Sequence, residues 1–297
     1  MSPQLVTPEL ALVYAQWRCR FKEERANQLL LSQHLPLARE KHTMKSPTPT
    51  QIIALAALTS ATILSPAAHA DITGFNNLEG WSYNQSDNET PASLPDPETI
   101  HITGTGGTQT RSIFNTTRQE FSQFTASFTY SGSFVSQFGT NQGMSFILQN
   151  DPAGANSIGG NQGGFAYSGM TNSIATTWNT RLNTIGFSTG GVVSVGVPVE
   201  GITLDGNNDI DFTLTYDGTF LIQRLIDTVT GVEFTQNLFV GDLSSVLMDD
   251  LAYVGFGATS IGSDQVISNF SYTTVPTPGS VGVLTAGLFA ATRRRRS

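Results

Sequence analysis

The sequence predicts an all-β protein whose strands pack as an antiparallel β-sandwich, or jelly roll. Glycine is abundant, with 29 of 297 residues, while only 13% of the residues are charged. This composition suits short strands joined by turns better than it suits helices. Apolar and polar residues also alternate with a period of two in several separate segments, as they do in half-buried strands.

The alternating segments follow one another between residues 124 and 272. In residues 124–130 the aromatic side chains share one face with an alanine, and polar side chains occupy the other face. Asp217 and Gly218 are a hairpin-turn signal between two such segments. The predicted strands cover residues 124–130, 144–148, 210–216, 219–227, 252–258 and 266–272.

Helical patterns are scarce in the same region. One short helical turn is expected at residues 241–250. Many short strands without long helices imply packed antiparallel sheets. Residues 71–274 are about the right size for one such domain. The only cysteine is Cys19, so no disulfide forms within the chain and the fold depends on its core.

Charge is distributed very unevenly along the chain. Between Asp71 and Val275 there are four arginines, no lysine and 19 carboxylates, a net charge near −15. A surface of this sign repels nucleic-acid phosphates, which argues against DNA or RNA as a partner. It is compatible with neutral glycans or with bridging cations.

Residues 44–70 have the features of a secretory signal peptide. A methionine and a lysine precede the apolar stretch 52–64, and Ala68 and Ala70 form a small-x-small cleavage signal. We therefore expect cleavage before Asp71. A buried helix is the alternative interpretation of the apolar stretch.

Residues 1–43 do not fit this pattern. They contain Cys19 and six basic residues ahead of Met44. We interpret them as the result of a start codon assigned too early. A long positively charged leader region is the alternative.

The chain ends in an uncharged run, residues 279–292, followed by a basic cluster. As a helix, its 14 residues would span about 21 Å, against about 30 Å of membrane hydrocarbon. Such a run would make a weak, transient anchor whose arginines stay on the cytoplasmic side. The basic cluster consists of Arg293, Arg294, Arg295 and Arg296.

Residues 275–297 resemble a PEP-CTERM sorting signal, which combines a Pro-x-Pro motif, an apolar helix and a terminal arginine cluster. The motif here is Val275, Pro276, Thr277 and Pro278, with threonine where the family has glutamate. The resemblance implies recognition by an exosortase-type processing enzyme, transient membrane insertion and release of the tail. A plain C-terminal membrane anchor is the alternative.

A second resemblance covers most of residues 111–272. Separate motifs in the expected order make this region similar to the L-type (legume-like) lectins, which implies a concanavalin A-like sandwich. The motifs are Gly-Met-Ser-Phe at 143–146, Gln-Asn-Asp-Pro at 149–152, a glycine-rich loop, Asn-Ser-Ile-Ala at 172–175, and the segments 242–262 and 266–272.

The lectin resemblance also implies the position of a sugar site. Where the family has an aspartate that accepts hydrogen bonds from sugar hydroxyls, this chain has Gln142. A backbone N–H of the glycine-rich loop would come from Gly163 or Gly164, and an amide side chain from Asn183. The candidates for an aromatic platform are Phe165, Tyr167 and Trp178.

The resemblance is weakest at the family's metal site. Members that bind calcium and a transition metal use a glutamate and an aspartate where this chain has Thr177 and Asn179. Hard cations prefer carboxylate oxygens, and both carboxylates are replaced. We therefore expect no metal cofactor, although the family resemblance keeps calcium open.

Catalytic patterns are absent from the predicted domain. Glu120, Glu200 and Glu233 are isolated in the sequence, whereas retaining glycosidases need two carboxyl groups about 5 Å apart. His101 is the only histidine after the leader, so a Ser-His-Asp triad would depend on it alone. We expect a protein that is not an enzyme.

Together these features predict an exported carbohydrate-binding protein of the cell envelope or exopolysaccharide matrix. Its expected partners are a polysaccharide or glycan and the processing enzyme of the tail. The alternative is a structural or adhesive matrix protein that keeps the lectin fold without a sugar site.

Overall fold

A computed structural model of the chain describes residues 71–86, 92–134 and 142–274. The chain divides into two compact units, Met1–Thr62 and Ile63–Ser297, and every described residue belongs to the second unit. The predicted leader, residues 44–70, and the predicted sorting tail, residues 275–297, lie outside the described residues. Their assignments stay predictions.

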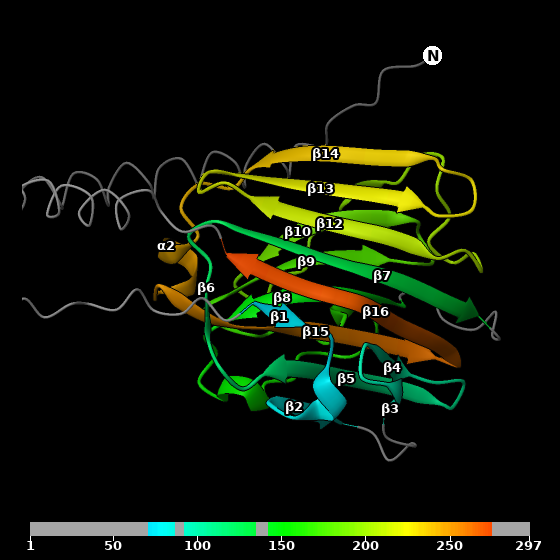
Figure 1. The fold of residues 1–297 in the computed structure, drawn as a ribbon, viewed down its shortest axis with the longest axis horizontal. Coiled ribbons are helices and arrows are strands. Elements are labelled where there is room, and N and C mark those ends of the chain that lie inside the picture. Colours follow the sequence, from blue (N-terminus) through cyan, green and yellow to red (C-terminus); the bar gives the residue numbers. More distant parts are fainter. Residues whose placement is uncertain (1–70, 87–91, 135–141, 275–297) are drawn as a thin grey trace, which may run out of the picture. The chain divides into compact units, whose positions relative to one another are not determined.

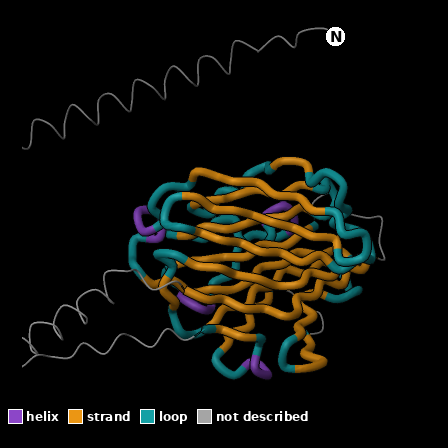
Figure 2. Tube along the Cα trace, turned by 45° about the horizontal axis from the view of Figure 1, so that its top comes forward, coloured by secondary structure: helices purple, strands orange, loops and turns teal. Residues whose placement is uncertain are grey.

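The described residues form two antiparallel sheets that pack face to face (Figures 1 and 2). Sheet A contains, in spatial order, β14 (Glu233–Phe239), β13 (Phe220–Asp227), β12 (Ile210–Tyr216), β7 (Phe124–Phe134), β16 (Ser263–Thr274), β4 (Thr99–Thr103) and β3 (Ser93–Asp96), with β1 (Ile72–Thr73) also paired to β16. Sheet B contains β11 (Val197–Pro198), β10 (Thr184–Thr189), β9 (Ser173–Asn179), β8 (Gly143–Gln149), β15 (Leu251–Ile261), β5 (Thr108–Asn115) and β2 (Trp81–Gln85), with β6 (Gln119–Glu120) paired to β15.

Helical structure in the described part of the chain is limited to single turns. These are η1 (Asn76–Leu78), η2 (Gly154–Asn156), η3 (Gln162–Gly164) and α2 (Ser244–Leu247). The helical turn expected at residues 241–250 is therefore confirmed as α2. Among the described residues, no helix has the length and apolar character that crossing a membrane requires.

The predicted fold class is confirmed, and so are the strands that predicted it. In β12 the alternation is regular, because its four apolar side chains are buried and the residues between them are half-buried. The predicted hairpin turn follows β12. There Asp217 accepts hydrogen bonds from the N–H groups of Thr219 (2.8 Å) and Phe220 (2.7 Å), and Gly218 takes a φ of +100° that favours glycine.

Aromatic side chains from both sheets fill the space between them. The ring of Phe128 lies 5.0 Å from the ring of Phe212 in sheet A and 5.7 Å from that of Trp178 in sheet B. Phe146 and Phe256 complete the cluster around Phe128, at 6.1 Å and 5.0 Å. Stacked and edge-on pairs of this kind add stability beyond the area they bury.

The outer face of sheet B is also covered, which explains why every residue of β8 and β9 is buried. A second apolar cluster on this face joins Ile147 and Ala175 of the sheet to Tyr167 and Met170 of the loop between β8 and β9. The same loop contains the glycine-rich segment. It therefore lies against the sheet and forms one wall of the site described below.

Candidate functional site

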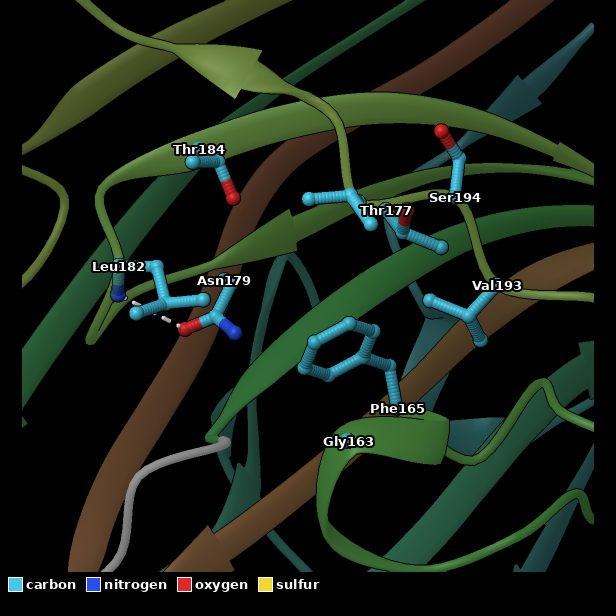
Figure 3. Close-up of a pocket in the computed structure, with 9 residues that line it drawn as sticks. Gly163, Phe165, Thr177, Asn179, Leu182, Thr184, Val193 and Ser194 are labelled. Atoms are coloured by element: carbon cyan, nitrogen blue, oxygen red, sulfur yellow. Dashed lines mark hydrogen bonds between the residues drawn. The ribbon is translucent and has the colours of Figure 1, made fainter. Parts of the chain in front are cut away.

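A pocket of about 240 Å³ opens on the outer face of sheet B, where β9 ends and β10 begins. We call it the end pocket. Three successive segments contribute to it: the glycine-rich loop, the β9–β10 hairpin and the loop after β10 (Figure 3). Its lining residues are Gly163, Phe165, Thr177, Asn179, Leu182, Thr184, Val193, Ser194 and Val195.

Strand alternation decides which side chains of β9 reach the pocket. Trp178 points into the sandwich core, so its neighbours Thr177 and Asn179 point to the outer face of the sheet. The Thr177 hydroxyl lies 3.2 Å from that of Ser188 on the adjacent strand β10. The Asn179 side-chain oxygen accepts hydrogen bonds from the N–H groups of Arg181 (3.0 Å) and Leu182 (2.9 Å), which shapes the hairpin beside the pocket.

The glycine-rich loop is attached to sheet B at two points. The Ser145 hydroxyl donates to the carbonyl of Phe165 (2.8 Å), and the Thr259 hydroxyl donates to the carbonyl of Gln162 (2.6 Å). Phe165 takes a φ of +50° at the end of η3. These contacts hold its ring against the pocket.

Polar and apolar side chains are mixed around the pocket. In Figure 3 Thr184, with its hydroxyl directed inward, lies on the same side as Asn179 and Leu182, whereas the Phe165 ring, Val193 and Ser194 lie on the other side. Leu182 and Val195 are largely exposed at the rim, at 56% and 84%. None of the nine lining side chains is charged. Such a surface suits a neutral ligand with both hydroxyl groups and C–H faces.

The structure brings only part of the predicted sugar site together. Gly163 lines the end pocket. Gly164 lies next to it, but its N–H donates to the carbonyl of Asn161 (2.8 Å). The Gln142 side chain is buried, and its amide oxygen accepts a hydrogen bond from the Ser263 hydroxyl (2.6 Å).

Asn183 serves the structure of the hairpin. Its side-chain nitrogen donates to the carbonyls of Val199 (2.7 Å) and Ile202 (2.8 Å), and its side-chain oxygen accepts from the N–H of Leu204 (2.8 Å). The Asn183 amide is therefore engaged with the 199–204 segment, and it is not among the lining residues of the pocket. Sugar contacts by Gln142, Gly164 and Asn183 stay predictions.

The three platform candidates have different environments. Phe165 lines the pocket. Trp178 is fully buried and lies 4.8 Å from the ring of Phe212 in the core. Tyr167 is also fully buried, and its hydroxyl donates to the carbonyl of Ser173 (3.2 Å). Burial raises the pKa of Tyr167 above its usual value.

The side chains at the position of the lectin family's metal site do not fit a hard divalent cation. Thr177 offers a neutral hydroxyl, and the Asn179 oxygen already accepts two N–H groups. Calcium takes six to eight oxygen ligands and is favoured by carboxylates. Among the described residues, no three histidine, cysteine or acidic side chains lie close enough together to hold a metal ion. The function proposed for this pocket does not depend on a metal ion.

Sequence reasoning missed half of the pocket. Leu182, Thr184 and the loop residues 193–195 were not predicted as site residues. No local pattern in the sequence marks these residues as pocket lining.

A larger hollow, of about 420 Å³, lies among β1, β2 and the β3–β4 turn. Its lining includes the carboxylates of Asp71, Glu79 and Glu98. None of the predicted site residues contributes to it. The end pocket is therefore the candidate site.

The residues considered for catalysis do not assemble an active site. The His101 ring lies 3.0 Å from the Asp264 carboxylate, but in the described part of the chain no hydroxyl is bonded to the imidazole. Glu233 forms an ion pair with Arg224, at 2.7 Å.

Solved structures that resemble this chain are legume lectins and a lectin-like protein. Arcelin-5 of Phaseolus vulgaris, described as a lectin-like defence protein, has a TM-score of 0.59 at 17% identity over 70% of this chain and 99% of its own. Lectin II of Ulex europaeus has a TM-score of 0.57 at 16% identity, and the match covers 70% of this chain and 98% of that lectin. A Bauhinia forficata lectin in complex with GalNAc has a TM-score of 0.57 at 17% identity, and the match covers 70% of this chain and 99% of that lectin.

These likenesses show that the fold is the legume-lectin β-sandwich. No family model matches the sequence. No curated protein matches it either. Because the sequence identities to these lectins are low, the likeness concerns the fold, and the function depends on the pocket itself.

Proposed function

We propose that this protein is a non-enzymatic carbohydrate-binding protein that holds a neutral sugar in the end pocket. One observation carries the proposal. The pocket places the hydroxyl of Thr184 across from the Phe165 ring and the side chain of Val193, with no charged residue in its lining. A sugar ring presents both hydroxyl groups and apolar C–H faces, so it matches a pocket that mixes polar and apolar groups.

The fold supports the same proposal. The Bauhinia forficata lectin that this chain resembles is in complex with GalNAc, and another similar structure is lectin UEA-II complexed with galactose. The end pocket lies beside the glycine-rich loop, where the sequence resemblance expected the sugar site. Binding in this pocket is proposed to be independent of metal, since Thr177 and Asn179 offer neutral donors.

A structural or adhesive role without sugar binding is the second candidate. It is favoured by the three hydrogen bonds that engage the Asn183 amide with the 199–204 segment. The burial of Gln142 supports it too. Both side chains were expected to contact sugar, but both form hydrogen bonds within the protein.

The proposal includes export. The leader at residues 44–70 and the tail at residues 275–297 support transfer across the membrane and transient anchoring, followed by release by an exosortase-type enzyme. The domain would then act in the cell envelope or the exopolysaccharide matrix. Its strong negative charge is compatible with neutral polysaccharides there.

A glycan array with calcium, repeated with a chelator, tests the binding proposal. The wild-type protein is expected to bind one class of neutral glycan equally under both conditions. Ser194→Trp should lower the affinity at least about tenfold, because an indole would fill the pocket. Ser122→Trp is the matched control, since Ser122 is exposed and lies outside the pocket lining.

A folded wild-type protein that binds no glycan on a broad array would favour the structural candidate. Binding that the chelator abolishes would contradict the metal-free site. Binding that Ser194→Trp leaves unchanged would place the sugar elsewhere.

A further inference from the structure

The larger hollow, of about 420 Å³, has a size usual for a ligand site and a chemistry unlike that of the end pocket. It lies among β1, β2, the β3–β4 turn and residues 115–119, and we call it the acidic hollow. Its lining includes Asp71, Glu79, Trp81, Glu98, Asn115 and Gln119. In sheet B four strands separate β2 from β10, so the acidic hollow and the end pocket are distinct places on the protein.

Three carboxylates line the acidic hollow without a cation to balance them. Asp71, Glu79 and Glu98 are exposed, and none of the lining residues is basic. Among the described residues, none of these three carboxylates has an ion pair or a hydrogen bond. The hollow also belongs to a region with a net charge near −15. It therefore attracts a ligand that carries positive charge.

Two buried side chains at the hollow have polar atoms without a partner. Trp81 is 9% exposed and Gln119 is 7% exposed. Within the described residues the indole N–H of Trp81 has no hydrogen-bond partner, although it is not sealed from solvent. The Gln119 amide donates to the Thr117 carbonyl (2.9 Å), but its side-chain oxygen has no partner in the described part of the chain. A donor and an acceptor in such surroundings are suited to the hydroxyl groups of a ligand.

Backbone contacts fix the walls of the acidic hollow. The N–H groups of Phe75 (2.7 Å) and Asn76 (3.0 Å) both donate to the carbonyl of Pro97, which joins the segment after β1 to the β3–β4 turn. The Trp81 ring packs 5.2 Å from the ring of Phe75 and 6.0 Å from that of Phe270. A hollow that is formed in advance needs little ordering when a ligand binds.

The arrangement suits an organic cation better than a metal ion. Among the described residues, no three acidic, histidine or cysteine side chains lie close enough together to hold one metal ion. A hollow of this volume has room for a sugar ring. The amides of Asn115 and Gln119 match sugar hydroxyl groups, and separate carboxylates match ammonium groups carried on the same sugars. A neutral sugar would leave the three carboxylates without a counter-charge.

We propose that the acidic hollow is a second carbohydrate site, which binds a glycan with protonated amino groups, such as an oligomer of glucosamine. Glu79 and Glu98 accept hydrogen bonds from the ammonium groups, while the Trp81 N–H and the Gln119 oxygen bind hydroxyl groups. This site does not depend on the sugar binding proposed for the end pocket. With both sites occupied, one molecule would connect a neutral and a cationic polysaccharide.

Calorimetric titration of the full chain with a glucosamine tetramer tests the proposal. At about pH 5.5 the carboxylates are charged and the sugar amines are protonated. The wild type is expected to bind the tetramer, and to bind its N-acetylated counterpart at least about tenfold more weakly, because acetylation removes the positive charge. Spermidine, a polyamine without sugar rings, should also bind at least about tenfold more weakly.

Variants locate the binding. Glu79→Gln with Glu98→Gln should lower the affinity for the tetramer at least about tenfold. Glu200→Gln with Asp250→Asn is the matched control, since both residues are exposed, lie outside the hollow and change the net charge equally. The control should keep the wild-type affinity. Ser194→Trp, which fills the end pocket, should keep it as well.

Tryptophan fluorescence provides a second measurement. Of the tryptophans that the structure describes, Trp81 lines the hollow and Trp178 is fully buried in the core. The glucosamine tetramer is expected to change the emission of the wild type. Trp81→Phe keeps an aromatic ring in the core but removes the indole, so it should abolish this change.

Four results would overturn the proposal. The first is a wild type that does not bind the tetramer. The second is an equal loss of affinity in the control double variant, which would indicate attraction by net charge alone, or a loss in Ser194→Trp, which would place the tetramer in the end pocket. The third is equal affinity for spermidine or for the acetylated tetramer. The fourth is a fluorescence change that persists in Trp81→Phe.

Discussion

At the scale of the residue, Asn183 illustrates how one side chain holds a loop in position. Its backbone has a φ of +53°, a conformation that asparagine tolerates better than most residues. Its amide bonds to three backbone groups between residues 199 and 204. Asn183 lies between Leu182 and Thr184, which both line the end pocket, so these bonds position one wall of the site.

Replacing Asn183 by alanine is expected to lower the free energy of unfolding by about 2 kcal/mol. The variant loses three hydrogen bonds. It also has alanine at a position with positive φ, a conformation that alanine disfavours. Urea unfolding measures this change. Asn207→Ala is the control, since Asn207 is exposed in the same region, and it should change stability by less than about 0.5 kcal/mol. A loss in Asn183→Ala no larger than that of the control would contradict the assigned role.

At the scale of the element, Asp151 ties the end of β8 to the start of β9. One carboxylate oxygen accepts from the Ala153 N–H (3.0 Å) and the Ser157 hydroxyl (3.1 Å). The other accepts from the N–H (2.9 Å) and hydroxyl (3.0 Å) of Thr171. Partial burial raises the pKa of Asp151, but these hydrogen bonds outweigh it, and the pKa lies below its usual value.

A lowered pKa means that the folded state favours the carboxylate, so Asp151 stabilises the fold above the unfolded-state pKa of about 3.9. This contribution is lost as the pH falls through the folded-state value. Asp151→Asn should be less stable than the wild type by about 1 kcal/mol at neutral pH, allowing for solvent screening, and the difference should shrink below about pH 4.

Thermal unfolding between neutral pH and pH 3 measures this effect. Asp250→Asn is the matched control for the loss of one carboxylate, because Asp250 is exposed. A difference between Asp151→Asn and the wild type that stays constant down to the lowest pH would refute the role of the carboxylate charge.

At the scale of the whole molecule, the sequence joins segments of very different character. The domain between Asp71 and Val275 is acidic, whereas the leader region and the tail hold the lysines and most arginines. This separation fits the proposal that both basic segments serve export and are removed afterwards. The end pocket belongs to the domain that would remain.

Intact-mass spectrometry of the exported protein from its native cell tests the export proposal. The measured mass is expected to be that of a chain without residues 1–70, because the leader is cleaved before Asp71. The chain should also be without the four terminal arginines, because the tail is released. An exported form that retains Arg293 to Arg296 would contradict processing of the tail and favour a plain membrane anchor.

The strands could be predicted because their signals are local. Ile210, Phe212, Leu214 and Tyr216 alternate with polar residues, and side chains in a strand alternate between its faces, so the pattern alone identifies the buried side of β12. The turn at Asp217 depends on bonds to residues two and three positions later. Composition and period therefore determined the fold class.

The site could be predicted only in part, because its residues meet through tertiary contacts. The resemblance pointed to Gly163 and Phe165, and the positions of Thr177 and Asn179 followed from it, but Leu182, Thr184 and residues 193–195 had no local signal of pocket lining. The resemblance also made Trp178 a platform candidate. The direction of β9 in the sheet decided that it belongs to the core.

The sequence by itself determined that this chain is an acidic β-sandwich flanked by basic segments, since alternation, turn residues and charge are properties of short stretches. Only the tertiary structure decided which polar side chains remain available for a ligand. Asn183 and Gln142 have the donors and acceptors that a sugar site needs. In the folded chain Asn183 binds backbone groups of the 199–204 segment, and Gln142 accepts a hydrogen bond from Ser263. A hydrogen-bonding group satisfied inside the protein is not free for a partner, and that assignment depends on residues brought together by folding.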